Sequence, residues 1–175
     1  MELVLVERRF EQPIDFQDIQ LREIAASWCH DTYNVRFLKT FFSRDRRRML
    51  CLYEAPDAEA VRAAEEQAKI PFERAWTCQN LRGDDLPMHA AAKEYVVVER
   101  SYPAPITPEY LSSAFGKARS CFEIHRTSYQ ESFLSRDGLT MVCVFRAPDA
   151  EAVRTANDQI QAPYTDVWTA SVHLP

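Results

Sequence analysis

Apolar and polar residues alternate along the chain in an order that predicts strands and helices in turn. Val4–Phe10 is rich in β-branched residues and ends before a turn, which is typical of a strand. Asp15–Thr32 predicts a helix, and its apolar stripe consists of Leu21, Ile24, Ala25 and Trp28. The elements that follow are a β-hairpin of Val35–Phe42 and Met49–Glu54, a helix at Asp57–Ala68 and a strand at Phe72–Leu81. The order is βαββαβ, the ferredoxin-like unit.

The same order of elements occurs again in the second half of the chain, because the sequence contains an internal repeat. The stretch Ala-Pro-Asp-Ala-Glu-Ala-Val-Arg occurs at Ala55–Arg62 and, 92 residues later, at Ala147–Arg154. At this offset Val4–Arg8 also matches Val96–Arg100. We therefore expect ferredoxin-like repeat one at residues 1–82, a linker at 83–94 and repeat two at 95–175.

The repeated stretch has a structural explanation. Asp57 and its counterpart Asp149 can each cap the helix that follows. Glu59 and Glu151 then lie in the first helical turn, where the helix dipole favours negative charge. The stretch therefore indicates a strand-to-helix joint rather than a catalytic motif.

The two copies differ inside the first helix. Copy two carries the stripe Leu111, Ala114, Phe115, Ala118 and Phe122, which does not superpose on that of copy one at the same offset. We expect small compensating shifts within this helix, so the pairing of Cys29 with Cys121 stays open.

One ferredoxin-like unit is an antiparallel sheet with helices on one face only, so its other face must be covered. Two units joined by a short linker can cover each other, sheet face to sheet face. We predict an α+β protein in which two βαββαβ repeats form an intramolecular dimeric α+β barrel. Such a chain is a monomer acting as a pseudo-dimer, or it forms a homo-oligomer.

Alternation of side chains along the strands divides each sheet into two faces. We predict that an aliphatic face packs under the helices, made of Val4, Val6, Leu50, Leu52, Val96, Val98, Val142 and Val144. The opposite face is more mixed, and we expect it to line a pocket in which Glu7 and Glu99 point between the sheets. The pocket candidates are Glu7, Glu99, Lys39, Tyr53, Tyr129, Trp76, Trp168 and His125.

A structural role is open for these candidates as well. Lys39 or the neighbouring arginines can neutralise Glu7, since buried charges are usually paired. Trp76 and Trp168 can anchor a core, and His125 can be a chance neighbour of other polar groups.

Composition narrows the function classes. The formal net charge of −5 argues against a nucleic-acid or anionic-membrane binder. Five cysteines without a Cys-x-x-Cys pair favour free thiols in the cytoplasm, although one disulfide stays open. The apolar run at the start of the sequence is too short for a signal-peptide core. No histidines pair at metal-ligand spacing, and no nucleophile-elbow motif supports catalysis.

Several stretches give the chain a resemblance to a known family. They are VLVERRF, SRDRRRMLCLYEAPDAEAVR and IPFERAW, the most specific part being a strand that ends in Cys-x-Tyr-Glu-Ala-Pro before an acidic helix start. The chain resembles a family of small ferredoxin-like proteins, catalogued as a domain of unknown function, whose best-described member binds nickel. Copy two departs from the pattern at Phe145 and Arg146. Because single-copy members pair as dimers, the resemblance agrees with the barrel predicted above.

The resemblance implies nickel as the possible metal. Family members commonly have a histidine in the second strand, where this chain has Lys39 and Glu131. A lysine does not suit a cation site, which leaves Glu99 with Glu131 as a weak oxygen-only metal site.

Three hypotheses follow. The first is a protein that binds a small molecule or a metal ion without catalysis. The second is an enzyme, a cofactor-independent oxygenase or isomerase of the kind that other α+β barrels host. The third is a structural or oligomerising module without a ligand.

Overall fold

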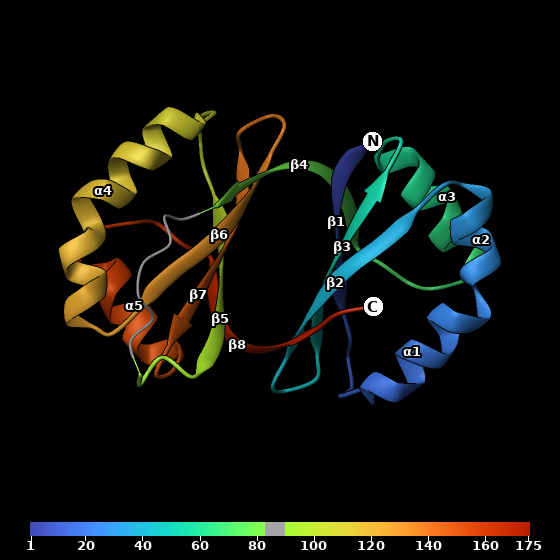
Figure 1. Ribbon diagram of the computed structural model, residues 1–175, viewed down its shortest axis with the longest axis horizontal. Helices are drawn as coiled ribbons and strands as arrows, with labels where there is room; N and C mark the ends of the chain where they lie inside the picture. Colours follow the sequence, from blue (N-terminus) through green and yellow to red (C-terminus); the bar gives the residue numbers. More distant parts are fainter. Residues whose placement is uncertain (83–89) are drawn as a thin grey trace. The chain divides into compact units, whose positions relative to one another are not determined.

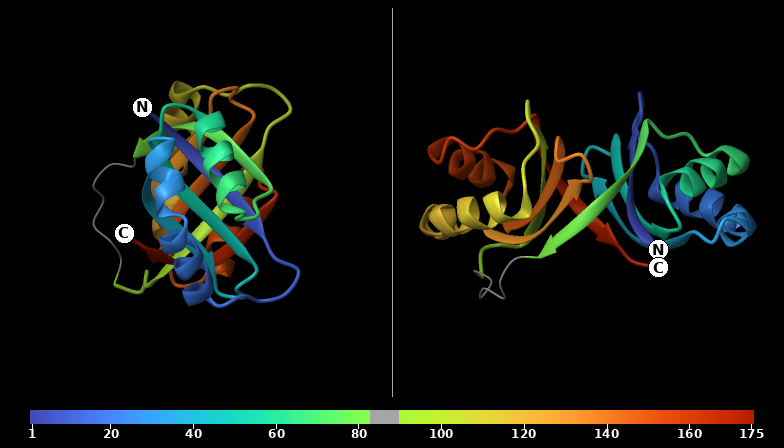
Figure 2. Two further views of the ribbon diagram at one scale, coloured as in Figure 1. Left: turned by 90° about the vertical axis from the view of Figure 1, so that its right-hand side faces the viewer. Right: turned by 90° about the horizontal axis from the view of Figure 1, so that it is seen from above.

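The computed structural model describes residues 1–82 and 90–175, which form two compact units. Unit one consists of Met1–Cys78 with Ser171–Pro175, and unit two of Gln79–Ala170. The protein is α+β, and the order βαββαβ occurs twice, as the sequence predicts. In each unit the helices lie on one face of an antiparallel sheet (Figure 1), and the views of Figure 2 agree.

Unit one is built around its first strand. Its elements are β1 (Glu2–Arg9), α1 (Phe16–Ala25), α2 (Ser27–Thr32), β2 (Arg36–Ser43), β3 (Arg48–Ala55), α3 (Ala58–Ala68) and β4 (Arg74–Arg82). Strand β1 pairs antiparallel with both β3 and β4, and β2 pairs with β3. The C-terminal residues Ser171–Pro175 also belong to this unit, where Ser171 Oγ donates to the Phe42 carbonyl at 3.4 Å.

Unit two repeats this plan. Its elements are β5 (Glu94–Ser101), α4 (Pro108–Ile124), β6 (Ser128–Ser135), β7 (Thr140–Ala147), α5 (Ala150–Gln159) and β8 (Asp166–His173). Strand β5 pairs antiparallel with β7 and β8, and β6 pairs with β7. Of the linker expected at 83–94, residues 83–89 lie outside the described residues, and strand β5 already begins at Glu94.

The pairing register corrects the predicted faces. Val4 lies opposite Tyr53 and packs with it in the core beneath the helices. Leu5 lies opposite Leu52, so both occupy the other face, away from the helices. The prediction that Leu50, Leu52, Val142 and Val144 pack under the helices is therefore wrong. The error arose because each strand was divided into faces by itself, whereas the register decides which residues of two strands share a face.

The helix predicted at Asp15–Thr32 is also corrected, because it is divided at Ala26 into α1 and α2. The predicted apolar stripe points outward, and the exposed fractions are 66% for Leu21, 69% for Ile24 and 55% for Trp28. The residues of α1 and α2 that are buried or half-buried instead include Ile19, Glu23, Cys29 and His30.

The offset of 92 residues holds through this region, so the expected compensating shifts are absent. Val35 N donates to His30 O, and Thr127 N donates to Phe122 O, both at 2.8 Å. Cys29 therefore matches Cys121. These two thiols and the other three cysteines are buried and free.

The repeated stretch forms the predicted joint in both units. Asp57 accepts a hydrogen bond from Ala60 N, and Asp149 accepts one from Ala152 N, both at 2.8 Å. The arginine at the end of each repeated stretch donates to a carbonyl of the last strand of its unit, as Arg154 Nη2 does to Val167 O at 2.7 Å. The duplicated sequence is thus a helix cap and a helix-to-strand anchor.

Candidate functional site

The two glutamates predicted for a pocket each bind a tryptophan. Trp76 Nε1 donates to Glu7 Oε1 at 2.7 Å, and Trp168 Nε1 donates to Glu99 Oε1 at 2.8 Å. Arg74 also forms an ion pair with Glu7. Both glutamates lie on the sheet face away from the helices, because they pair with Leu50 and Val142. The same Glu–Trp contact in both units makes it a feature of the repeated scaffold.

The pair expected to ligate a metal comes from two strands that are not neighbours in the sheet. Glu99 lies opposite Val142 on β7, and Glu131 lies opposite Val144 on the other side of β7. Two strand spacings, about 10 Å in all, therefore separate their backbones. Asn80 Nδ2 donates to Glu131 Oε2 at 2.9 Å.

Three further candidates have contacts of other kinds. Lys39 Nζ is 5.5 Å from the centre of the Phe41 ring. Tyr129 donates to the Leu81 carbonyl at 2.9 Å, and its ring packs in the core of unit two. His125 is half-buried, and its Nε2 lies 2.8 Å from Gln159 Oε1.

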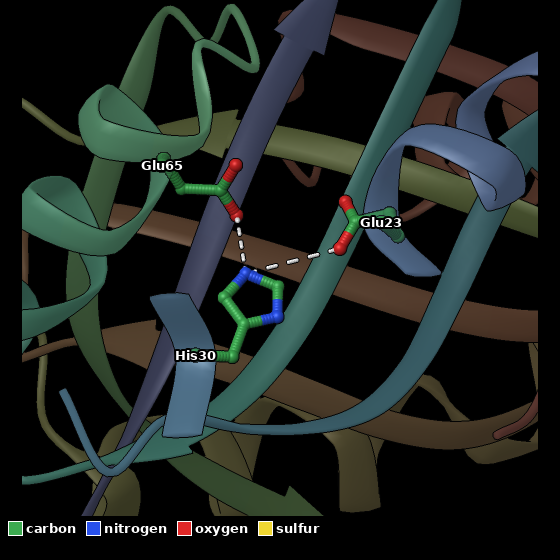
Figure 3. A group of neighbouring side chains, drawn as sticks. All are labelled: Glu23, His30 and Glu65. Carbon is green, nitrogen blue, oxygen red and sulfur yellow. Dashed lines mark ion pairs between the residues drawn. The ribbon is translucent and has the colours of Figure 1, made fainter. Parts of the chain in front are cut away.

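Tyr53, the remaining candidate, leads to a polar cluster that the sequence did not reveal. Five elements of unit one supply it: Arg8 from β1, Tyr53 from β3, Glu23 from α1, His30 from α2 and Glu65 from α3. Glu23, His30 and Glu65 point toward one another (Figure 3), and one donor atom of each lies within 4.8 Å of the other two. We call these three residues the carboxylate–histidine cluster.

Distances within the cluster show close charge pairing. His30 Nε2 lies 3.7 Å from Glu65 Oε1 and 3.9 Å from Glu23 Oε2. Arg8 Nη2 lies 2.9 Å from Glu65 Oε1 and 3.3 Å from Glu23 Oε1. The Tyr53 hydroxyl lies 3.3 Å from Glu23 Oε1 and can donate to it. The side chains of Arg8 and Glu65 are 1% and 0% exposed, so this pairing takes place out of water.

Several polar atoms of the cluster have no aligned hydrogen bond. These atoms are His30 Nε2 and both carboxylate oxygens of Glu65, all of them buried. Glu65 Oε1 is ion-paired with Arg8, but not in hydrogen-bonding geometry. Buried polar atoms are nearly always satisfied in folded proteins, whereas these atoms have charge contacts with one another and with Arg8.

The charges in the cluster shift one another's protonation. Burial alone would lower the pKa of His30, but the carboxylates of Glu65 and Glu23 outweigh it and raise that pKa. Burial would raise the pKa of Glu65, whereas His30 and Arg8 lower it, with a net decrease. Burial and repulsion from Glu65 raise the pKa of Glu23. When His30 is protonated, the cluster therefore has two carboxylates, Glu23 and Glu65, and two cations, Arg8 and His30.

A cavity of about 320 Å³ opens beside the cluster, inside unit one. Glu23 and His30 lie in its wall, together with the hydroxyl of Thr40 and the thiol of Cys51. The rest of the lining is largely apolar and includes Phe16, Ile19, Phe37, Met49 and Leu174. The side chain of His173 stacks on Phe16 at 3.7 Å between ring centres.

The comparison of the two repeats holds the signal that could have identified this cluster. At the offset of 92, Glu23 corresponds to Phe115, His30 to Phe122 and Glu65 to Asn157. Arg8 is retained as Arg100. Apolar or neutral residues thus stand in copy two where copy one has three ionisable groups.

The donor set suits a divalent transition metal. Imidazole is a preferred ligand of nickel, zinc and copper, and carboxylates complete many such sites. Two donors on one tetrahedral zinc ion lie about 3.4 Å apart, and His30 Nε2 lies 3.7 Å from Glu65 Oε1 and 3.9 Å from Glu23 Oε2. Two of the three donor groups, His30 and Glu65, include buried atoms without hydrogen bonds. Arg8 would stay in contact with both carboxylates and hold them in place.

Sequence comparison identifies the family. Residues 5–77 and 95–169 match the family described as nickel responsive protein SCO4226-like. The chain belongs to this family, with both repeats matched. A comparison with curated proteins finds no match.

Several solved structures resemble the chain at low sequence identity. The chlorite dismutase-like protein TA0507 is 11% identical with a TM-score of 0.51, and the match covers 99% of this chain and 96% of that one. An anthrone oxidase-like protein is 11% identical with a TM-score of 0.47, and the match covers 99% of this chain and 93% of that one. A monooxygenase-like protein from Listeria innocua is 10% identical with a TM-score of 0.43, and the match covers 99% of this chain and 94% of that one. The first match shows the fold alone, and that fold is the predicted dimeric α+β barrel class.

In the part of the chain that the structure describes, no helix combines the length and the apolar character needed to cross a bilayer.

Proposed function

We propose that the protein binds a divalent transition-metal ion, with nickel as the first candidate, at Glu23, His30 and Glu65. The observation that carries the proposal is the convergence of these donors within 4.8 Å at a buried place where several lack hydrogen bonds. Membership of a family described as nickel responsive supports the choice of metal. The site differs from the oxygen-only pair Glu99 and Glu131 because it includes an imidazole.

Each residue has a distinct part in this proposal. His30 supplies the nitrogen donor after it loses its proton, and Glu23 and Glu65 supply negative charge. Arg8 and the Tyr53 hydroxyl hold the Glu23 carboxylate from the side of the sheet. A bound divalent ion would supply positive charge in place of the proton on His30. The cavity beside Glu23 and His30 would give the ion access to solvent or to further ligands.

Calorimetric titration of the purified, chelator-treated protein with nickel tests the proposal. We expect one tight site that is lost in His30→Phe, which installs the residue found at the matching position of unit two. Matched controls are His125→Asn, a histidine of unit two, and the double variant Glu99→Gln/Glu131→Gln. Both controls should bind nickel like the parent.

Two outcomes would count against this site. Retention of nickel by His30→Phe would remove the cluster from consideration. Loss of nickel in Glu99→Gln/Glu131→Gln would move the metal to the sheet face away from the helices. Far-ultraviolet circular dichroism of each variant shows whether its fold is intact.

A further inference from the structure

Unit two has an aromatic side chain at the position that matches Glu23 of α1. The Phe115 ring of α4 stacks on Tyr129 with 4.2 Å between ring centres and 23° between planes. In unit one the matching positions are Glu23 and Phe37. The aromatic ring contributed by the helix is therefore replaced by a carboxylate.

The partner of that ring is preserved in unit one. Phe37 meets Tyr53 at 5.8 Å and 64°, and Tyr129 meets Phe145 at 5.8 Å and 65°. Phe37 therefore has the orientation of Tyr129 relative to its neighbour on the sheet. It lines the cavity together with Phe16 and Met49.

The cavity is large enough for an aromatic molecule. It measures about 320 Å³, and an apolar cavity of about 150 Å³ already accepts benzene. Its walls are mainly apolar, with Glu23 and His30 at the polar end. Arg8 does not line it and is 1% exposed, so the ionisable groups that meet a ligand are the Glu23 carboxyl group and the His30 ring. The Glu23 carboxylate accepts hydrogen bonds.

We infer that the cavity binds a small, uncharged aromatic molecule with one hydrogen-bond-donating group. Its ring takes the place that Phe115 has in unit two, against Phe37, and its donor meets Glu23. Protein side chains make all the proposed contacts with the ring of the ligand, and no metal ion takes part in them. The inference therefore goes beyond the proposed metal binding and does not depend on it.

Ligand-detected NMR on the full, chelator-treated chain tests this inference with three matched probes. Benzyl alcohol should bind. Cyclohexylmethanol, which has the same hydroxyl but no aromatic ring, should bind roughly threefold to tenfold more weakly, because a stacked aromatic pair contributes beyond its buried area. Benzoate has no hydrogen-bond donor for Glu23 and should bind at least tenfold more weakly than benzyl alcohol. If cyclohexylmethanol or benzoate binds with the same affinity as benzyl alcohol, the inference is overturned.

Variants connect the binding to this cavity. Glu23→Phe rebuilds the ring of unit two and should weaken benzyl alcohol binding by at least tenfold. Leu21→Ala, on the exposed side of the same helix, should leave binding unchanged. If Glu23→Phe fails to fold, Phe37→Leu should still weaken binding about threefold through loss of the stack. Unchanged affinity in a folded Glu23→Phe or Phe37→Leu protein would contradict the assignment.

The outcome is separable from that of the nickel experiment. Benzyl alcohol binding without nickel binding would leave the aromatic site standing and remove the metal site. Nickel binding without benzyl alcohol binding would leave the metal site standing and remove the aromatic site.

Discussion

The two units place the same buried arginine in different surroundings. In unit one, Arg8 faces the carboxylates of Glu23 and Glu65, with His30 beside them. In unit two, Arg100 donates to Asn157 Oδ1 at 2.5 Å and to the Pro163 carbonyl at 2.6 Å. Arg8 makes the second contact as well, with the Pro71 carbonyl at 2.9 Å.

The shared carbonyl contact explains why both repeats keep the arginine. It ties the first strand of each unit to the loop that precedes the last strand. Among the residues that the structure describes, the carboxylate contacts occur in unit one, where they accompany a histidine. In unit two, Phe122 and Phe145 pack at 5.2 Å in the corresponding place. The two units thus differ in the groups that surround the arginine, which are ionisable in unit one and neutral in unit two.

The largest expected difference between the units concerns this arginine. Arg8→Met should destabilise unit one by about 3–5 kcal/mol, because it leaves buried carboxylates without their counter-charge. Arg100→Met removes hydrogen bonds to neutral acceptors and should cost unit two about 1–3 kcal/mol. Hydrogen exchange followed by mass spectrometry measures the local stability of each unit. Equal losses in the two units would show that the carboxylates add nothing to the role of Arg8.

The pH dependence of nickel binding gives an intermediate effect that is specific to unit one. The pKa of His30 is raised from its ordinary value of 6.5, and binding requires the neutral imidazole. Below the raised pKa, each metal ion displaces about one proton, so affinity should rise about tenfold per pH unit and level off above it. Further protonation of Glu23, whose pKa is also raised, should steepen the dependence in acid. Calorimetry in acidic buffers of different ionisation enthalpy, below the pKa of His30, counts the protons released, and a count of zero there would exclude His30 as a ligand.

The smallest effect should be the same in both units. Asp57→Ala and Asp149→Ala each remove one helix cap and should each cost about 1 kcal/mol, because the two caps have the same geometry. Hydrogen exchange in α3 and α5 provides the measurement. A clear inequality would mean that the two joints, although identical in sequence, differ in their contribution to stability.

Much of the fold could be predicted because its signals are local. The repeat offset placed the strands, and Asp57 and Asp149 cap helices as expected. The outward stripe of α1 and α2 could not be predicted, since Leu21, Ile24 and Trp28 have the composition of a buried face. The bulky apolar residues face solvent there, and the helices direct Glu23 and His30 toward the sheet.

The candidate site was harder to predict than the fold. Of the residues proposed from the sequence, only Tyr53 contacts the cluster, where its hydroxyl meets Glu23 and Arg8. The glutamates in the strands attracted notice because charge is unusual in a strand, whereas Glu23 and Glu65 resemble ordinary solvent-exposed residues of charged helices. Alignment of the two repeats was the one sequence signal for them.

The sequence alone determined the number of repeats, the order of their elements and the joints between strand and helix. These features depend on turns, caps and periodicity within short stretches. Only the tertiary structure decided which side of α1 and α2 is buried and which charges meet. The strand register and the packing of α1, α2 and α3 on one sheet bring Arg8, Glu23, His30 and Glu65 together, although they are widely spaced along the chain.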